Sequence, residues 1–186
     1  MLSQSTFKRF FNRSIAAKGA KHQSRQLTDG ELALARSVFG DSLKLDSVQL
    51  KTAWWILKHY AVSPNGNIYF HPADWVTDFS QCSLAKQSWL IHELTHVWQL
   101  QHGLKVVRGA IINHRYDYVL EAGKSFFNYG IEQQARMVQD YFVRRHRGHD
   151  CRNFEVCIPF LAAPNLSAPT LDTNHNSHEN HSSFKV

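Results

Sequence analysis

The sequence has no long run of apolar residues. None of its segments approaches the roughly 20 consecutive apolar residues that a membrane-spanning helix needs, which excludes a membrane span. Residues 1–17 carry basic side chains without a continuous apolar stretch, which excludes a Sec signal peptide. We therefore expect a protein that stays in the cytoplasm or leaves it by a route that needs no cleaved signal.

Cysteine is also scarce. The three cysteines, Cys82, Cys151 and Cys157, do not have the spacing of a zinc finger. Cys151 and Cys157 could close a small disulfide-bonded loop in an oxidising compartment, and three free thiols are the alternative. The sequence is compatible with either the disulfide or the free thiols.

The excess of positive charge is moderate and concentrated in a few places. The formal net charge is +6, and much of it comes from the N-terminal residues and from Arg144, Arg145 and Arg147. Such basic segments can contact nucleic acid or anionic lipid. No aromatic–basic RNA motif and no recognition-helix pattern accompanies them, so we do not expect a nucleic acid partner.

The composition predicts one globular domain between two polar ends. A chain of 186 residues with 43% hydrophobic residues is long enough to bury one core. We assign residues 27–162 to this domain and residues 1–26 to a basic N-terminal arm. Residues 163–186 are rich in Pro, Ser, Asn and Thr, a composition typical of a disordered tail.

Local patterns predict an α+β domain that is mainly helical. A capping box at Thr28–Glu31 begins the first helix, and a turn at Pro64–Gly66 precedes the second strand, which could pair with the first. The predicted elements are helices over 28–39, 84–101 and 131–146 and strands over 47–53, 67–71 and 116–120.

One segment carries metal-binding chemistry. The run His92-Glu93-Leu-Thr-His96 is an H-E-x-x-H motif inside the helix predicted over 84–101. On a helix, His92 and His96 lie about 6 Å apart along the axis and on the same face. Both imidazoles can then bind one Zn²⁺ ion, while Glu93 lies close enough to act as general base without ligating the metal.

The residues around the motif support this interpretation. The motif helix is apolar over most of its circumference, which indicates a buried helix. Its one polar stripe holds His92 and His96, and burying these side chains without partners would be costly. A metal ion at the base of a cleft would resolve that conflict.

A catalytic zinc ion needs a third protein ligand. His102 has the offset of the metzincin pattern, but Gln99 stands where that pattern has the glycine that ends the helix. An unbroken helix would place His102 about 9 Å beyond His96 and off the ligand face. Glu132 is the better candidate, because packing of its helix on the motif helix would explain its position, and Glu121 is the fallback.

Other polar residues receive less weight. His114, Arg115, Tyr116 and Tyr118 follow the motif helix and could polarise a substrate carbonyl, although such residues are more often surface or packing residues. Asp140 falls opposite the apolar stripe of its own helix, so we expect a solvated surface role for it.

Three segments together carry a family resemblance. They are His92–Gln99, Tyr129–Ala135 and Asp140–Phe142. The segment Leu27–Glu31 and the predicted strand at Asn67–Phe70 support the same resemblance. With these motifs, residues 27–145 resemble the bacterial zincin-like metallopeptidase domains that are associated with Vgr-type spike proteins of the type VI secretion system. The combination of the motif helix with Ile-Glu-Gln-Gln-Ala is more specific than H-E-x-x-H alone.

The resemblance implies a fold, a site and a role. The fold would be zincin-like and of the gluzincin type, with the active-site helix packed on a second ligand-bearing helix beside a small β-sheet or hairpin. Zn²⁺ would be bound by His92, His96 and Glu132, and Glu93 would be the catalytic base. The protein would hydrolyse peptide bonds in a protein or peptide substrate.

The resemblance also implies a bacterial effector or toxin that a type VI secretion system delivers from the cytoplasm into a target cell. A Vgr-type spike carrier and an immunity protein would be its partners. The sequence shows no spike or PAAR-like delivery segment, so the chain would travel as separate cargo or stand alone. The alternative function is a zinc-stabilised binding module, a pseudoenzyme that keeps the fold without hydrolysis.

Overall fold

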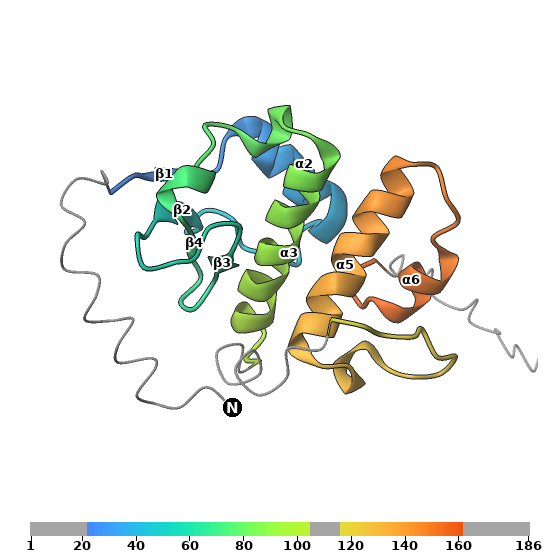
Figure 1. Cartoon of the computed structure of the whole chain (residues 1–186). Helices are drawn as coiled ribbons and strands as arrows, with labels where there is room; N and C mark the ends of the chain where they lie inside the picture. Colours follow the sequence, from blue (N-terminus) through green and yellow to red (C-terminus); the bar gives the residue numbers. More distant parts are fainter. Residues whose placement is uncertain (1–21, 105–115, 162–186) are drawn as a thin grey trace, which may run out of the picture.

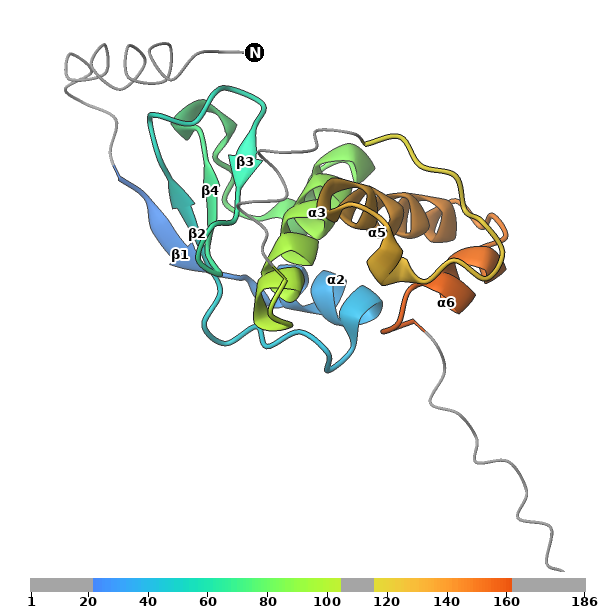
Figure 2. The same cartoon turned by 90° about the horizontal axis from the view of Figure 1, so that it is seen from below.

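The fold is built around one central helix. A computed structural model of the chain describes residues 22–104 and 116–161. In it, helix α3 (Leu84–Gln101) lies between a small sheet and helix α5 (Ile131–His146), as two perpendicular views show (Figures 1 and 2). The predicted α+β class and the packing of the motif helix on the helix predicted over 131–146 are confirmed. The predicted tail and residues 1–21 of the predicted arm lie outside the described residues.

The sheet has four short strands in the order β1-β2-β4-β3. Strand β2 pairs antiparallel with β1 and parallel with β4, and β3 pairs antiparallel with β4. The strands predicted over 47–53 and 67–71, and their pairing, are confirmed. The strands are β1 (Ser24–Gln26), β2 (Gln49–Thr52), β3 (Ala61–Val62) and β4 (Ile68–Phe70).

A buried carboxylate joins the first strand to the first helix. Helix α2 (Asp29–Phe39) begins at the predicted capping box, with Thr28 as N-cap. The Glu31 side chain, which is fully buried, accepts two hydrogen bonds from the Arg25 guanidinium at 2.6 and 2.7 Å. It also accepts bonds from the backbone N–H groups of Thr28 at 2.9 Å and Phe79 at 2.7 Å. Arg25, which falls in the predicted arm, is thereby part of the folded domain.

Replacement of Glu31 by alanine is expected to destabilise the domain strongly. It would leave the Arg25 guanidinium, only one-fifth exposed, without its charge partner and would free two backbone donors. Breaking a buried ion pair in this way costs about 3–5 kcal/mol. Urea unfolding followed by circular dichroism measures the loss, with Asp41→Ala as the control because Asp41 is fully exposed in its ion pair. Equal stability of the two variants would contradict the structural role of Glu31.

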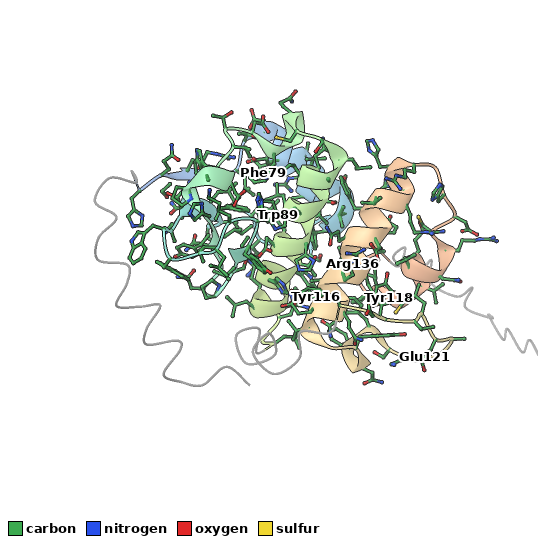
Figure 3. All side chains as sticks on the ribbon, in the orientation of Figure 1. Phe79, Trp89, Tyr116, Tyr118, Glu121 and Arg136 are labelled. Atoms are coloured by element: carbon green, nitrogen blue, oxygen red, sulfur yellow. The ribbon has the colours of Figure 1, made fainter. Side chains whose placement is uncertain are left out.

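Aromatic side chains fill the space between the sheet and α3. Phe70 on β4 lies 5.1 Å from Phe79 and 5.0 Å from Trp89, measured between ring centroids. Figure 3 shows Phe79 and Trp89 on the sheet side of α3. Four aliphatic residues of α3 are fully buried, as the apolar circumference of the motif helix predicted: Leu90, Ile91, Leu94 and Val97.

The prediction of a strand over 116–120 is wrong. Residues 116–121 have no regular secondary structure, and side chains satisfy several of their backbone groups. Gln133 donates to the carbonyl of Asp117 at 2.6 Å, and the Tyr129 hydroxyl donates to the carbonyl of Val119 at 2.9 Å. The alternation of residue types is real, but the segment lies along α5 and pairs with no strand of the described residues.

Short elements complete the described chain. Helix α6 (Arg152–Cys157) packs against α5, and the three 3-10 turns are η2 (Pro72–Asp74), η3 (Phe79–Gln81) and η4 (Phe126–Asn128). Within residues 22–104 and 116–161, every helix is too short or too polar to cross a lipid bilayer.

Candidate metal centre

Two helices bring three ligand-type side chains together. His92 and His96 come from α3, and Glu132 comes from the first turn of α5. The Nε2 atoms of both histidines lie 3.3 Å from Oε2 of Glu132. All three residues are buried, and their nearest ligand atoms lie within 4.8 Å of one another. This buried His-His-Glu group could bind a metal ion.

Gln99 determines which nitrogen of His96 faces this group. Its Nε2 donates to the carbonyl of Ile131 and to Oε1 of Gln134, both at 2.9 Å. These two bonds orient the amide so that Oε1 of Gln99 faces Nδ1 of His96 at 2.8 Å. An amide oxygen only accepts, so Nδ1 of His96 carries a proton, and in the neutral imidazole Nε2 is then the nitrogen with the lone pair. This is the tautomer that a metal ligand needs.

The hydrogen bonds and charges within the group favour a positive charge at its centre. Burial alone would lower the pKa of His96, but its hydrogen bond with Glu132 and the charges of Glu93 and Glu132 outweigh burial, and the pKa is raised. Burial would raise the pKa of Glu132, but its hydrogen bonds with His92 and His96 outweigh that effect, and this pKa is lowered. Converging lone pairs and a carboxylate oxygen are stabilised by a proton or by a metal cation.

The donor set fits zinc. Two imidazole nitrogens and one carboxylate oxygen are the protein ligands of many catalytic zinc sites, which keep a fourth position open. The buried Nδ1 of His92 has no hydrogen bond partner among the described residues. Nδ1 of His96, by contrast, is held by Gln99, and a hydrogen bond of this kind orients an imidazole that binds a metal through its other nitrogen.

Glu93 lies beside the group and has its own support. It follows His92 on α3 and is 4% exposed. The hydroxyl of Ser63, directly after β3, donates to Oε2 of Glu93 at 3.0 Å. One carboxylate oxygen is therefore positioned by a contact across 30 residues of sequence. Ser63 was missed by sequence reasoning, because a lone serine before a turn carries no signal of such a contact.

The structure does not bring the other ligand candidates to the group. His102 is exposed at the end of α3, where its Nδ1 lies 2.8 Å from the carbonyl of Trp98 and its ring stacks on the Trp98 indole. Helix α3 continues through Gln99, as the absence of a glycine predicted. Glu121 is exposed, pairs with Lys124 at 2.7 Å and lies at the periphery, away from α3 (Figure 3).

Of the two candidate tyrosines, Tyr116 lies nearer the group. The ring of Tyr116 lies 6.3 Å from that of His92, and burial followed by the charges of Glu132 and Glu93 raises its pKa. Tyr118 lies farther along α5, beside Arg136 (Figure 3), and its hydroxyl donates to Asp140 at 2.9 Å. Asp140 is therefore a partly exposed partner of Tyr118 and Arg136 rather than a fully solvated residue.

Two of the less-weighted residues, His114 and Arg115, lie outside the described residues. The three cysteines are free thiols, which corresponds to the second of the two sequence-based alternatives.

Replacement of Gln99 by methionine is expected to weaken zinc binding without removing a ligand. Methionine has a similar volume but cannot accept the Nδ1 proton of His96 or tie α3 to Ile131. Loss of such a supporting contact typically costs about 10- to 100-fold in metal affinity. Competition with a chromogenic chelator measures the change. Gln101→Met, at the exposed end of the same helix, is the control, and equal affinities would contradict the role of Gln99.

The chain is similar to a protein of a bacterial secretion system. No model of a protein family matches the chain. Over 134 residues it is 42% identical to the type VI secretion system spike protein VgrG2b of Pseudomonas aeruginosa. This match covers 66% of the chain but only 13% of the spike protein. The solved effector domain of Pseudomonas aeruginosa VgrG2b matches with 36% identity and a TM-score of 0.63, covering 76% of this chain and 86% of that domain.

Proposed function

The chain belongs to the family of the VgrG2b effector domain, and from this premise we propose that it is a zinc-dependent metallopeptidase with a zincin-like fold. The observation that carries the proposal is the buried group of His92, His96 and Glu132 with Glu93 beside it. His92, His96 and Glu132 would hold Zn²⁺. The bound metal would supply Lewis acidity, which makes water a stronger nucleophile and polarises a substrate carbonyl.

Glu93 is the proposed general base. Its carboxylate would accept a proton from the attacking water and then pass that proton to the leaving amine. Ser63 supports this role, because its hydroxyl holds Oε2 of Glu93 and restrains the side chain at the edge of the group. The neighbouring Tyr116 is a candidate for a hydrogen bond to the carbonyl oxygen as negative charge develops on it.

The placement of β3 supports a peptide as the substrate. Among the described strands, β3 ends the sheet order, so one of its edges is unpaired. Ser63 follows β3 directly and contacts Glu93, so this edge adjoins the proposed catalytic base. An extended peptide can add to such an edge through main-chain hydrogen bonds. A scissile peptide bond would thereby be brought past Glu93.

The proposed biological role is that of a type VI secretion effector. The two relatives are a spike protein of that system and its effector domain. We propose that this chain reaches a target cell through association with a Vgr-type carrier. A cognate immunity protein would protect the producing cell.

Zinc content and proteolysis of the purified chain test the function. We expect about one zinc per chain and cleavage of casein that a chelator abolishes and added zinc restores. Failure to bind zinc would overturn the metal site. Stoichiometric zinc without cleavage across a broad panel of protein substrates would instead support the non-catalytic binding module.

A further inference from the structure

One loop exposes large apolar side chains to solvent. Between β2 and β3, the exposed fractions are 37% for Trp54, 54% for Trp55, 63% for Leu57 and 61% for Tyr60. The patch continues onto the sheet, where the ring of Tyr69 lies 6.5 Å from that of Trp55. We call these residues, with the two lysines among them, the aromatic–basic patch: Lys51, Trp54, Trp55, Leu57, Lys58, Tyr60 and Tyr69.

The loop has a defined conformation that holds these side chains outward. Two tight turns form it, closed by hydrogen bonds from Ile56 to Ala53 and from Tyr60 to Leu57. The buried Ile56 anchors the first turn in the core. In the second turn, His59 has a φ of 65°, a left-handed conformation that favours glycine.

Asp74 stabilises this unfavourable conformation. Its buried carboxylate accepts a hydrogen bond from the His59 backbone at 2.6 Å and lies 3.2 Å from Nδ1 of the same residue. Residues in sparsely populated backbone conformations cluster at functional sites. Exposed apolar patches of this kind mark interaction sites rather than ordinary surface.

The exposed charges of this loop and of the adjoining strand β2 are positive, whereas the carboxylate of Asp74 is buried. From residue 47 to residue 73 the sequence contains no Asp or Glu, although it contains Lys51 and Lys58. Lys51 is the register partner of Tyr69 on the neighbouring strand, and its Nζ lies 5.9 Å from the centre of the Tyr69 ring. Strands β2 and β4, which carry these two residues, lie on the side of α3 away from α5 (Figure 1). The patch thus combines cations with Trp, Leu and Tyr.

The patch adjoins the candidate metal centre. Tyr60 immediately precedes β3, and Ser63 immediately follows it and contacts Glu93. The Tyr60 hydroxyl, when ionised, is also close enough to Tyr116 to contribute to the raised pKa of that residue. Whatever binds the patch would therefore lie next to the proposed catalytic base.

We propose that the aromatic–basic patch binds the interface of a bilayer that contains anionic phospholipids. Trp and Tyr favour the region between headgroups and acyl chains, where one end of the side chain is apolar and the other is hydrated. Lys51 and Lys58 match the negative surface potential of such a bilayer. Binding would hold the candidate site at the membrane surface and favour substrates that lie there.

Vesicle binding by the full chain tests the proposal. We expect sedimentation with vesicles of phosphatidylglycerol and phosphatidylethanolamine at low salt, and little with phosphatidylcholine vesicles. The double variant Trp55→Ala/Leu57→Ala is expected to reduce the partition coefficient at least about tenfold, because it removes two apolar side chains that would enter the bilayer interface. Lys51→Gln/Lys58→Gln is expected to reduce it about fivefold for each charge. Binding of the wild type should shift tryptophan emission to shorter wavelength.

The controls change similar residues elsewhere on the surface. Val156→Ser removes an apolar side chain that is 86% exposed on α6, and Lys44→Gln removes an exposed cation from another loop. Both should bind as the wild type does, and thermal melting checks that all variants are folded. Absence of binding at low salt would overturn the proposal. Equal binding by Trp55→Ala/Leu57→Ala would also overturn it and assign lipid binding to another part of the chain.

A second measurement distinguishes lipid binding by the patch from peptide binding. If the double variant binds vesicles normally but hydrolyses a soluble peptide more slowly, the patch is a substrate subsite and the lipid proposal fails. Vesicle binding is measured without substrate, so its outcome does not depend on whether the chain is a peptidase.

Discussion

Glu93→Gln protein is expected to hydrolyse peptides about 10²- to 10⁴-fold more slowly than the wild type and to keep its zinc. Glutamine has nearly the same shape as glutamate, and its amide oxygen can still accept the hydrogen bond from Ser63. It cannot accept a proton from water at neutral pH. The local structure is therefore kept while the proposed base is removed.

Initial rates with a quenched fluorescent peptide, together with zinc analysis of the same samples, measure this effect. Glu121→Gln is the matched control, because Glu121 is an exposed glutamate outside the His-His-Glu group. Wild-type rates in the Glu93→Gln protein would remove Glu93 from the mechanism. Loss of both zinc and activity would show that the substitution disrupts the metal site, in which case the lower rate would not identify Glu93 as the base.

Glu132→Ala protein is expected to lose zinc, whereas His102→Ala protein is expected to retain it. Glu132 supplies the carboxylate oxygen that lies 3.3 Å from both imidazole nitrogens, and His102 is exposed at the end of α3. Removing a ligand should weaken binding by more than the roughly 10- to 100-fold that removal of a supporting contact costs.

Thermal unfolding with and without zinc gives a second measurement. A ligand present at about 100 times its Kd stabilises the folded state by about 2.7 kcal/mol. We expect this stabilisation for the wild type and His102→Ala and its absence for Glu132→Ala. The reverse pattern, with zinc kept by Glu132→Ala and lost by His102→Ala, would make the assignment of the third ligand wrong.

The convergence of His92, His96 and Glu132 could be predicted because each step depends on local sequence. The spacing of the histidines is one helical turn, and the apolar surface of α3 predicted a buried partner. A second amphipathic helix with a carboxylate in its first turn was the candidate partner. The absence of a glycine at position 99 correctly predicted that α3 continues and carries His102 away.

The supporting contacts could not be predicted in the same way. Ser63 reaches Glu93, and Gln99 reaches Ile131 and Gln134, only through the packing of distant segments. Residues 116–120 alternate like a strand, but which element would pair with them is a property of the whole fold. The side chains of Gln133 and Tyr129 satisfy that backbone instead.

The amide of Gln99 also has a consequence for chain length. Its bond to the carbonyl of Ile131 fastens the two ends of the segment between α3 and α5 to each other. The ends that bear His96 and Glu132 are therefore kept in register by a direct bond between the two helices, which does not depend on how many residues join them.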